Sequence, residues 1–377
     1  MGKTQYNPNF EIDRRLIAAG ASKTIYALVM PETERVLLET IAPSLRQGAT
    51  HLDEAVFAEW LDIYHDPWTK KQDAVHMEFF SAWRDWVKPA ADIGDGFEFL
   101  YPTAGASEGL IHLITSYGNL ARKEKFEPVI HIFEGEYEGY PAYAESQFIA
   151  VRKHSRTRWE SALDQIGARH QVYISQPSAI DGNLWRDFDR FVTRLFERQP
   201  AAEVIADVTY VGAVARDYHV SIDCPNVKAA VFSLSKPMGV YYHRIGGLLS
   251  RTAMPSLFGN QWFKNLLSLR YGTELMRRFG VRELPKKYSP LQLRAAAKAA
   301  TLLNLPVEPC DVVLMGAVPA MALREAGPAM AEYVIRTPGD SAISARLCLT
   351  PGMSELIWSI VARRRMTAAS VSGGPGA

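Results

Sequence analysis

The chain has 377 residues, 47% hydrophobic and 22% charged, so it can bury a sizeable core in two or three domains, or in one large domain with a smaller partner. Its 42 basic and 41 acidic residues give a net charge of +1 without a basic stripe or arm, so nucleic acid is not an expected partner. Cys224, Cys310 and Cys348 lie far apart without a CxxC pair, which argues against a disulfide framework or a metal site. The first residues lead into no apolar run, and nothing approaches the roughly 18 apolar residues of a membrane span. We therefore expect a cytoplasmic protein without a membrane partner.

The first part of the chain carries many large aromatic side chains at largely helical spacing: Trp60, Tyr64, Trp68, Phe79, Phe80, Trp83 and Trp86. The middle then alternates short apolar runs with amphipathic stretches, the pattern of βαβ units around a mostly parallel sheet. Helices are expected at Gly105–Ser116 and Leu184–Gln199. The expected strands are Phe97–Thr103, Pro128–Phe133, Gln171–Ser175, Glu203–Val208, Ala229–Leu234 and Gly247–Arg251.

Beyond about residue 255 the pattern changes to that of a smaller α+β lobe. Its expected helices are Trp262–Met276, Pro290–Leu303 and Glu355–Arg364, and its expected strands are Val312–Met315, Tyr333–Arg336 and Arg346–Leu349. These patterns predict a large α/β domain over residues 51–255 and a small C-terminal domain over 256–366. Residues 1–50 would form an arm and part of the small domain, and the Gly- and Ser-rich residues 367–377 a disordered tail.

The strongest chemical signal is the stretch Ser233-Leu-Ser235-Lys236-Pro-Met-Gly-Val-Tyr-Tyr-His-Arg244-Ile-Gly246. A lysine just after an apolar strand is expected to be partly desolvated, which lowers its pKa and yields the neutral amine that attacks an aldehyde carbon. Eight residues later, Arg244 could clamp a phosphate with two donors, and Gly246 lets the backbone pass close by. A surface lysine followed by an arginine is the simpler interpretation. The spacing SxSKx7RxG, however, closely resembles the lysine motif of fold-type I pyridoxal-phosphate enzymes, the aspartate aminotransferase superfamily.

This resemblance implies a mostly parallel, seven-stranded type of sheet with helices on both faces, and pyridoxal 5′-phosphate bound to Lys236 as a Schiff base. Ser233, Ser235 and Arg244 would bind the cofactor with it. Upstream, Asp207-Val-Thr-Tyr210 ends an apolar strand. By the same resemblance, Asp207 would bond the protonated pyridine nitrogen and Tyr210 the phenolate oxygen of the ring. An ionised carboxylate keeps the nitrogen protonated, so that the ring accepts electrons from a Cα carbanion. A helix cap or turn is the ordinary role of such an aspartate.

Three further features occur in the order that the family implies. Gly105, Ala106 and Ser107 link a strand to a helix, where exposed N–H groups and the helix dipole favour a phosphate. Tyr137 follows the next strand and would stack on the pyridine ring, although a core aromatic is the alternative. Arg346 lies on a short C-terminal strand and would bind the substrate α-carboxylate through two parallel bonds, although a solvated arginine is the alternative.

Two departures from the family pattern are visible. Gln176, in Ser-Gln-Pro-Ser, stands where the family commonly has an asparagine that bonds the phenolate oxygen, and its side chain is one methylene longer. The usual Gly-rich stretch before the phosphate-binding turn is absent, and the aromatic segment Trp60–Trp86 stands there instead. Both departures fit a specialised substrate rather than a dicarboxylate of central metabolism.

Two reactions therefore remain open, since one scaffold serves many chemistries. The first is aminotransfer from an L-α-amino acid through a Lys236 Schiff base and a Cα carbanion or quinonoid. The second is a non-transaminating reaction of specialised metabolism, similar to capreomycidine synthase: cyclisation, β- or γ-elimination, or γ-substitution. A cofactor-sensing regulator would need a DNA-binding domain, for which the chain has no room. The resemblance also implies a homodimer with a shared active site. The aromatic segment Trp60–Trp86 would contribute to its interface, with Tyr64 reaching the neighbouring phosphate, unless those aromatics are core.

Overall fold

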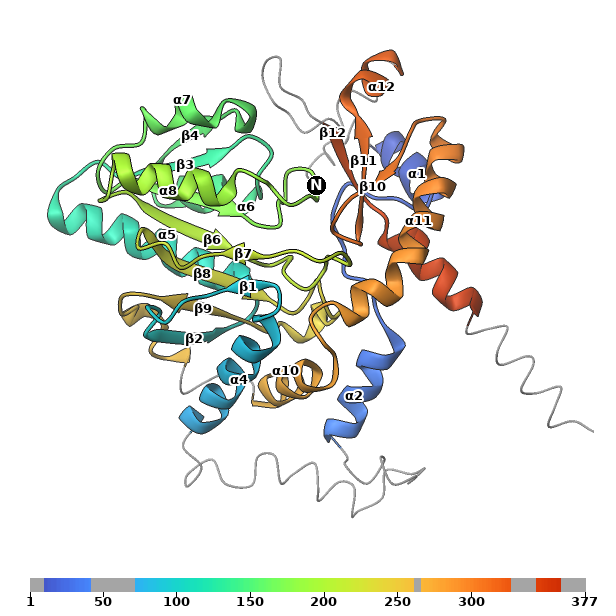
Figure 1. The fold of residues 1–377 in the computed structure, drawn as a ribbon, viewed down its shortest axis with the longest axis horizontal. Coiled ribbons are helices and arrows are strands. Elements are labelled where there is room, and N and C mark those ends of the chain that lie inside the picture. The colour runs from blue at the N-terminus through green and yellow to red at the C-terminus, as the bar shows by residue number, and fades with distance from the viewer. Residues whose placement is uncertain (1–9, 42–71, 261–265, 327–343, 361–377) are drawn as a thin grey trace, which may run out of the picture.

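The computed structural model describes residues 10–41, 72–260, 266–326 and 344–360. A seven-stranded sheet forms the centre of the larger lobe (Figure 1). Within this sheet β9 runs antiparallel to its neighbours β2 and β8, and the other adjacent pairs are parallel. The α/β class expected from the sequence is therefore confirmed. In spatial order the strands are β2 (Phe99–Thr103), β9 (Gly246–Ser250), β8 (Val227–Ser233), β6 (Glu203–Asp207), β5 (Gln171–Ser175), β3 (Val129–Phe133) and β4 (Ala150–His154).

Helices cover both faces of this sheet, because successive side chains of a strand point to opposite faces. In β5, Val172 and Ile174 pack into one apolar cluster, and Tyr173 packs into the other. The first cluster includes side chains of α4 (Gln72–Val87), α7 (Trp159–Leu163) and α8 (Phe188–Arg198). The second includes side chains of α5 (Ala106–Glu124) and α6 (Gly139–Ser146). The strands are therefore apolar on both sides, as buried parallel strands usually are.

The aromatic side chains of α4 lie in the core of the large lobe. Phe79, Phe80 and Trp83 are buried, and the Trp83 ring stacks on Phe232 of β8 with 4.2 Å between centroids. The helices α2 (Pro31–Ile41) and α10 (Leu266–Arg278) pack near α4, with α10 against both (Figure 1). The described part of the aromatic segment therefore belongs to the core, and the expectation that it forms an interface is wrong there. Trp60, Tyr64 and Trp68 lie outside the described residues.

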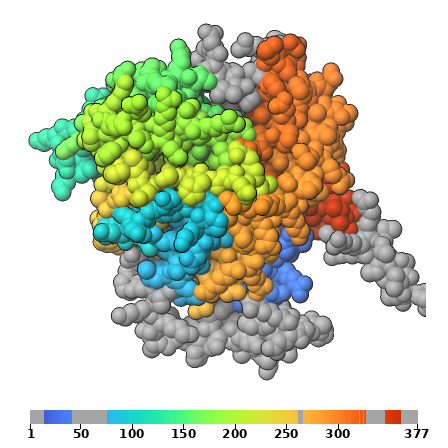
Figure 2. Space-filling model, viewed as in Figure 1, coloured from blue at the N-terminus to red at the C-terminus, as the bar shows by residue number. Residues whose placement is uncertain are grey.

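The second lobe is built on a three-stranded antiparallel sheet of β10 (Glu308–Pro309), β11 (Met315–Pro319) and β12 (Ser344–Cys348). The helices beside it are α1 (Phe10–Ala18), α11 (Glu283–Leu303), α12 (Ala320–Glu325) and a last helix over 350–360. In the space-filling view its orange surface lies directly beside the green surface of the large lobe (Figure 2). A short parallel pair, β1 (Ala91–Asp92) and β7 (Val220–Ser221), flanks the main sheet.

Several expected elements differ from the observed ones. The helix expected from Pro290 begins at Glu283, and the strand expected at Val312–Met315 begins only at Met315. The edge strand β4 was not expected, because its sequence Ala-Val-Arg-Lys-His is mostly exposed and carries no apolar run. The strand expected at 333–336 and the tail at 367–377 lie outside the described residues. The domain boundaries at 50, 255 and 366 stay predictions.

Three histidines form a hydrogen-bonded chain on the β3 side of the sheet. Nδ1 of His131 lies 2.7 Å from Nε2 of His154, and Nε2 of His131 lies 2.9 Å from Nδ1 of His170. The N–H of Gly167 donates to that same Nδ1 of His170, which must therefore be an acceptor. It follows that His131 donates from Nε2 and accepts at Nδ1 from His154. Burial lowers the pKa of His131 to about 3, so this ring stays neutral. No group of three or more His, Cys, Asp or Glu residues in the described ranges is placed to hold a metal ion.

Candidate active site

A cavity of about 510 Å³ lies at the carboxyl edge of the seven-stranded sheet, where open α/β sheets bind their ligands. The strands β6 and β8 place Asp207 and Lys236 there, while β2 and β3 lead into Ser107 and Tyr137. The structure brings ten of the predicted site residues together around the cavity: Ala106, Ser107, Tyr137, Asp207, Tyr210, Ser233, Ser235, Lys236, Arg244 and Arg346. These residues come from distant parts of the chain, so the fold alone assembles the site.

The amine of Lys236 is enclosed by the segment before α2. Its Nζ donates to the carbonyl oxygen of Ile25, and it lies 5.9 Å from the centroid of the Tyr241 ring. Burial lowers its pKa to about 8, with smaller contributions from the nearby positive charges of Arg346 and Arg244. Close to pH 8, about half of the protein molecules therefore carry Lys236 as the neutral amine, which can act as a nucleophile or a base.

The carboxylate of Asp207 is held at both of its oxygens. The phenol of Tyr140 donates to Oδ2 at 2.9 Å, and the N–H of Thr209 donates to Oδ1 at 3.0 Å. Burial raises the pKa of Asp207, and these two hydrogen bonds act in the opposite direction, because they favour the ionised form. The structure thus places a buried carboxylate with two donors at the end of β6, facing the cavity.

One end of the cavity combines a helix N-terminus with an arginine and serine hydroxyls. Gly105 precedes α5 with a φ of 82°, and a Cβ there would lie 3.1 Å from Nη2 of Arg244. The close approach also needs Gly246, whose Cβ would lie 2.7 Å from the Cα of Gly105. The Ser233 hydroxyl donates to that of Ser235 at 3.0 Å. Since N–H groups, hydroxyls and a guanidinium converge here, this end has the chemistry of a phosphate site.

Of three tyrosines that follow β3, one lines the cavity and the other two contact residues that line it. Tyr137 lines it directly, and its ring meets that of Tyr140 edge to face with 5.5 Å between centroids. Its hydroxyl lies 3.3 Å from the hydroxyl of Tyr143. Tyr143 in turn hydrogen-bonds Ser107 at the phosphate-like end, and burial raises the pKa of Tyr143 to about 12. The sequence analysis selected Tyr137 and missed the other two, although their spacing of three residues was a visible helical signal.

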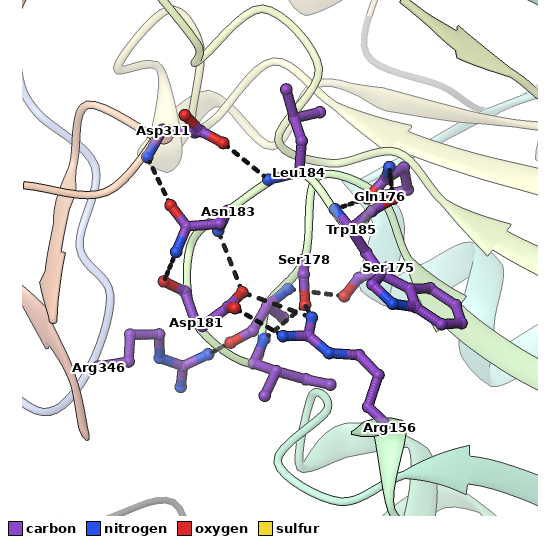
Figure 3. Close-up of polar contacts among 12 residues, drawn as sticks. Arg156, Ser175, Gln176, Ser178, Asp181, Asn183, Leu184, Trp185, Asp311 and Arg346 are labelled. Carbon is purple, nitrogen blue, oxygen red and sulfur yellow. Dashed lines mark hydrogen bonds and ion pairs between the residues drawn. The ribbon is translucent and has the colours of Figure 1, made fainter. Parts of the chain in front are cut away.

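The other end of the cavity is formed by Arg346 of β12 and a loop over 176–185 (Figure 3). Nη1 of Arg346 donates to the carbonyl oxygen of Ala179, which is the residue of this loop that lines the cavity. The Gln176 carboxamide is turned toward Trp185, donating to its carbonyl at 3.0 Å and accepting from its N–H at 3.1 Å. Gln176 is not among the described residues that line the cavity. Its contact with the ring stays a prediction.

An ion pair ties the same loop to the large lobe, and hydrogen bonds tie it to the second lobe (Figure 3). Arg156 pairs with Asp181 at 2.5 Å, and both side chains are largely buried. From the second lobe, Asp311 accepts the N–H of Leu184 at 3.0 Å and donates its own N–H to Asn183 at 2.9 Å. The position of the Ala179 carbonyl beside Arg346 is therefore fixed from several sides.

Sequence reasoning also missed the segment Lys23–Ile25, which lines the cavity opposite the sheet. These residues carry no motif, and only the folded chain places them beside Lys236. It further missed Glu136, a buried carboxylate that accepts from the N–H of Ser175 at 3.0 Å and from its hydroxyl at 2.5 Å. Burial raises the pKa of Glu136 to about 7.

Comparison with solved structures shows that this fold is similar to that of several aminotransferases and of a C–S lyase. No protein-family model matches the chain, and no curated protein matches its sequence. An Escherichia coli protein with a methionine aminotransferase function is 16% identical, with a TM-score of 0.60 over 93% of this chain and 96% of that one. A C–S lyase from Staphylococcus hominis with bound pyridoxal phosphate is 12% identical, with a TM-score of 0.61 over 93% and 96%. A double mutant of Thermus thermophilus aspartate aminotransferase is 12% identical, with a TM-score of 0.60 over 96% and 97%.

Proposed function

We propose that the chain is a pyridoxal-phosphate-dependent enzyme that acts on the α-amino group of an amino acid, with Lys236 as the residue that carries the cofactor. The observation that carries this proposal is the placement of the partly buried Lys236 in one cavity with two distinct groups. On one side lies the phosphate-like end with Ser107 and Arg244, and on the other the buried carboxylate of Asp207. The similar solved structures support it, since they include aminotransferases and a lyase with this cofactor.

The residues present fit the cofactor at each of its polar groups. The N–H groups of α5, the hydroxyls of Ser107 and Ser235, and Arg244 would hold the phosphate. Asp207 would hold the pyridine nitrogen, with Tyr137 against the ring face and Tyr210 near its oxygen. When bound, the cofactor supplies an aldehyde for the amine and a ring that accepts the electron pair released at the substrate Cα.

The side chains of this protein would then bind and orient the substrate and move its proton. Nζ of Lys236, once displaced by the substrate amine, is the base nearest the site and takes the Cα proton. Arg346 keeps one Nη engaged on Ala179, so its remaining N–H groups are available for a carboxylate. We infer that the carboxylate is the α-carboxylate of the substrate.

We propose aminotransfer as the reaction. The second candidate, elimination or substitution, is supported by the C–S lyase among the similar structures. Both reactions need Lys236 and Asp207, so the site residues serve either one.

One experiment separates these reactions. The protein, loaded with pyridoxal phosphate, is mixed with a panel of L-amino acids, and the absorbance of the bound cofactor is followed. Conversion to the amine form of the cofactor indicates aminotransfer, whereas recovery of the starting spectrum with release of a keto acid and ammonia indicates elimination. Borohydride reduction and peptide mapping test the site, because the label should lie on Lys236. A protein that neither binds the cofactor nor responds to any amino acid contradicts the proposal.

We also propose a homodimer with the active site at the interface. In support of this, Tyr241 and Tyr242 are exposed by 45% and 84% of their surfaces next to Arg244, at the mouth of the cavity. Large exposed aromatic side chains beside a functional cavity are typical of protein interfaces. Light scattering should give about twice the chain mass of 42.1 kDa. The cytoplasmic location stays a prediction. No helix in the described ranges is both long and apolar enough to cross a membrane.

A further inference from the structure

Glu136 is a buried carboxylate for which the proposed function has no use. It follows β3, is 6% exposed, and does not line the cavity. Both of its oxygens accept from Ser175, the last residue of β5, one from the N–H and the other from the hydroxyl. An ionisable side chain at such a position costs free energy unless its partners compensate, so its contacts are informative.

The hydrogen bonds of Glu136 continue into the loop that contacts Arg346. The Ser175 hydroxyl, which donates to Glu136, accepts the N–H of Ala179 at 2.7 Å. The carbonyl oxygen of Ala179 accepts a hydrogen bond from Nη1 of Arg346. An unbroken chain of polar contacts therefore runs from Glu136 through Ser175 and Ala179 to the arginine at the cavity.

We propose that Glu136 is a positioning residue for the carboxylate-binding end of the cavity, acting through Ser175 and Ala179 on Arg346. This role rests on the proposed function, in which Arg346 binds the substrate carboxylate. Arg346 is the middle residue of the short strand β12 in the second lobe, whereas Glu136 follows β3 and Ser175 ends β5 in the sheet of the first. The chain of contacts fixes the guanidinium relative to the sheet that carries Lys236 and Asp207.

The direction of each bond explains why a carboxylate is needed. The Ser175 hydroxyl accepts the Ala179 N–H, so its own proton points elsewhere, and Glu136 accepts that proton at one oxygen and the Ser175 N–H at the other. An amide at position 136 could keep its oxygen on the Ser175 N–H, but it would then present an NH₂ group to the hydroxyl. The hydroxyl would lose its charged acceptor and would have to rotate to accept from this NH₂ group, so the loop would shift.

The test compares ligands with and without a carboxylate. The protein loaded with pyridoxal phosphate is titrated with L-alanine and with ethylamine, which lacks the carboxylate, and the dissociation constants are taken from the absorbance of the bound cofactor. Glu136→Gln and Ser175→Ala should weaken L-alanine about three- to tenfold, the range expected for one hydrogen bond, and leave ethylamine unchanged. The affinity for the cofactor itself should also stay unchanged.

Tyr173→Phe is the matched control, because it removes a buried hydroxyl from the same strand that bonds Gln171 at 2.9 Å instead. This substitution should leave the ratio of the dissociation constants for L-alanine and ethylamine as in the wild type. Equal weakening of L-alanine and ethylamine by Glu136→Gln, or no change in either, overturns the positioning role while the proposed function stands. If the wild-type protein binds the cofactor but neither ligand nor any other amino acid, the proposed function is wrong, and the positioning role of Glu136 is wrong with it.

Discussion

Removal of the Tyr140 hydroxyl should make the site sensitive to acid. The phenol donates to Asp207 at 2.9 Å, is fully buried, and is one of two donors on that carboxylate. A hydrogen bond to a charged group contributes about 1.5 to 3 kcal/mol, and one pKa unit corresponds to about 1.4 kcal/mol. Burial already raises the pKa of Asp207, so Tyr140→Phe, which removes a donor to the charged form, should raise this pKa further. Asp207 would then become protonated at a higher pH, and the negative charge proposed to hold the cofactor nitrogen would be lost.

The assay is the pH profile of the rate of reaction with an amino acid, together with the dissociation constant of pyridoxal phosphate at each pH. In Tyr140→Phe the acid limb of the rate profile should move to higher pH, while the rate on the plateau changes much less. Tyr143→Phe serves as the comparison, since its hydroxyl contacts Tyr137 and Ser107 rather than Asp207. An unchanged acid limb in Tyr140→Phe would show that this hydrogen bond does not set the charge of Asp207.

Three further predictions concern other parts of the molecule. Lys236→Ala should abolish turnover and the absorbance of covalently attached cofactor, while the phosphate contacts still bind free cofactor; the spectrum after gel filtration checks this. Arg346→Ala should raise KM for amino acids by about 10- to 100-fold with unchanged cofactor affinity, since it removes a charged bidentate contact, and the reverse pattern in steady-state kinetics would argue against that role. His131 has a pKa of about 3 in the folded protein, against 6.5 in the unfolded chain. The stability that this difference gives the protein is therefore complete above pH 6.5 and declines as the pH falls toward 3. Between pH 7 and pH 5 the free energy of unfolding should fall by about 2 kcal/mol from this group, and urea titrations of His131→Leu should show a shallower decline.

The sheet strands were predictable from the sequence where burial leaves a clear pattern. Gln171–Ser175 is apolar enough on both faces to be recognised, and the observed bounds of β5 agree with the prediction. The edge strand β4 pairs with β3 on one side only, and no described strand pairs with its other edge. Its sequence therefore combines exposed polar residues with few apolar ones and lacks the apolar run of a buried strand. Helix ends were shifted for a related reason. The first turn of α11 includes charged and proline residues that tertiary packing holds in a helix.

The site was predictable where a residue stands at the end of a strand or shortly after it, as Asp207 and Lys236 do. Chain order and the carboxyl edge of the sheet then suffice to place them together. Residues that act through another side chain leave no such trace. Tyr140 and Glu136 contact Asp207 and Ser175 across 67 and 39 residues, and only the register of neighbouring strands brings them within reach. The hydrogen bonds of the Gln176 side chain to the backbone of Trp185 could not be predicted from the motif either, because Trp185 lies nine residues further along the loop.

The three tyrosines beside the cavity have a consequence for redesign of the enzyme. Tyr137, Tyr140 and Tyr143 extend from one short helix and the turn before it, and each reaches a different part of the site. A rotation of α6 would displace all three together. Substitutions here that widen the substrate range would therefore also disturb the hydrogen bond from Tyr140 to Asp207. The segment Lys23–Ile25 also lines the cavity and belongs to no helix or strand. Libraries that vary Thr24 should therefore change which side chains enter while leaving the hydrogen bond from Tyr140 to Asp207 intact.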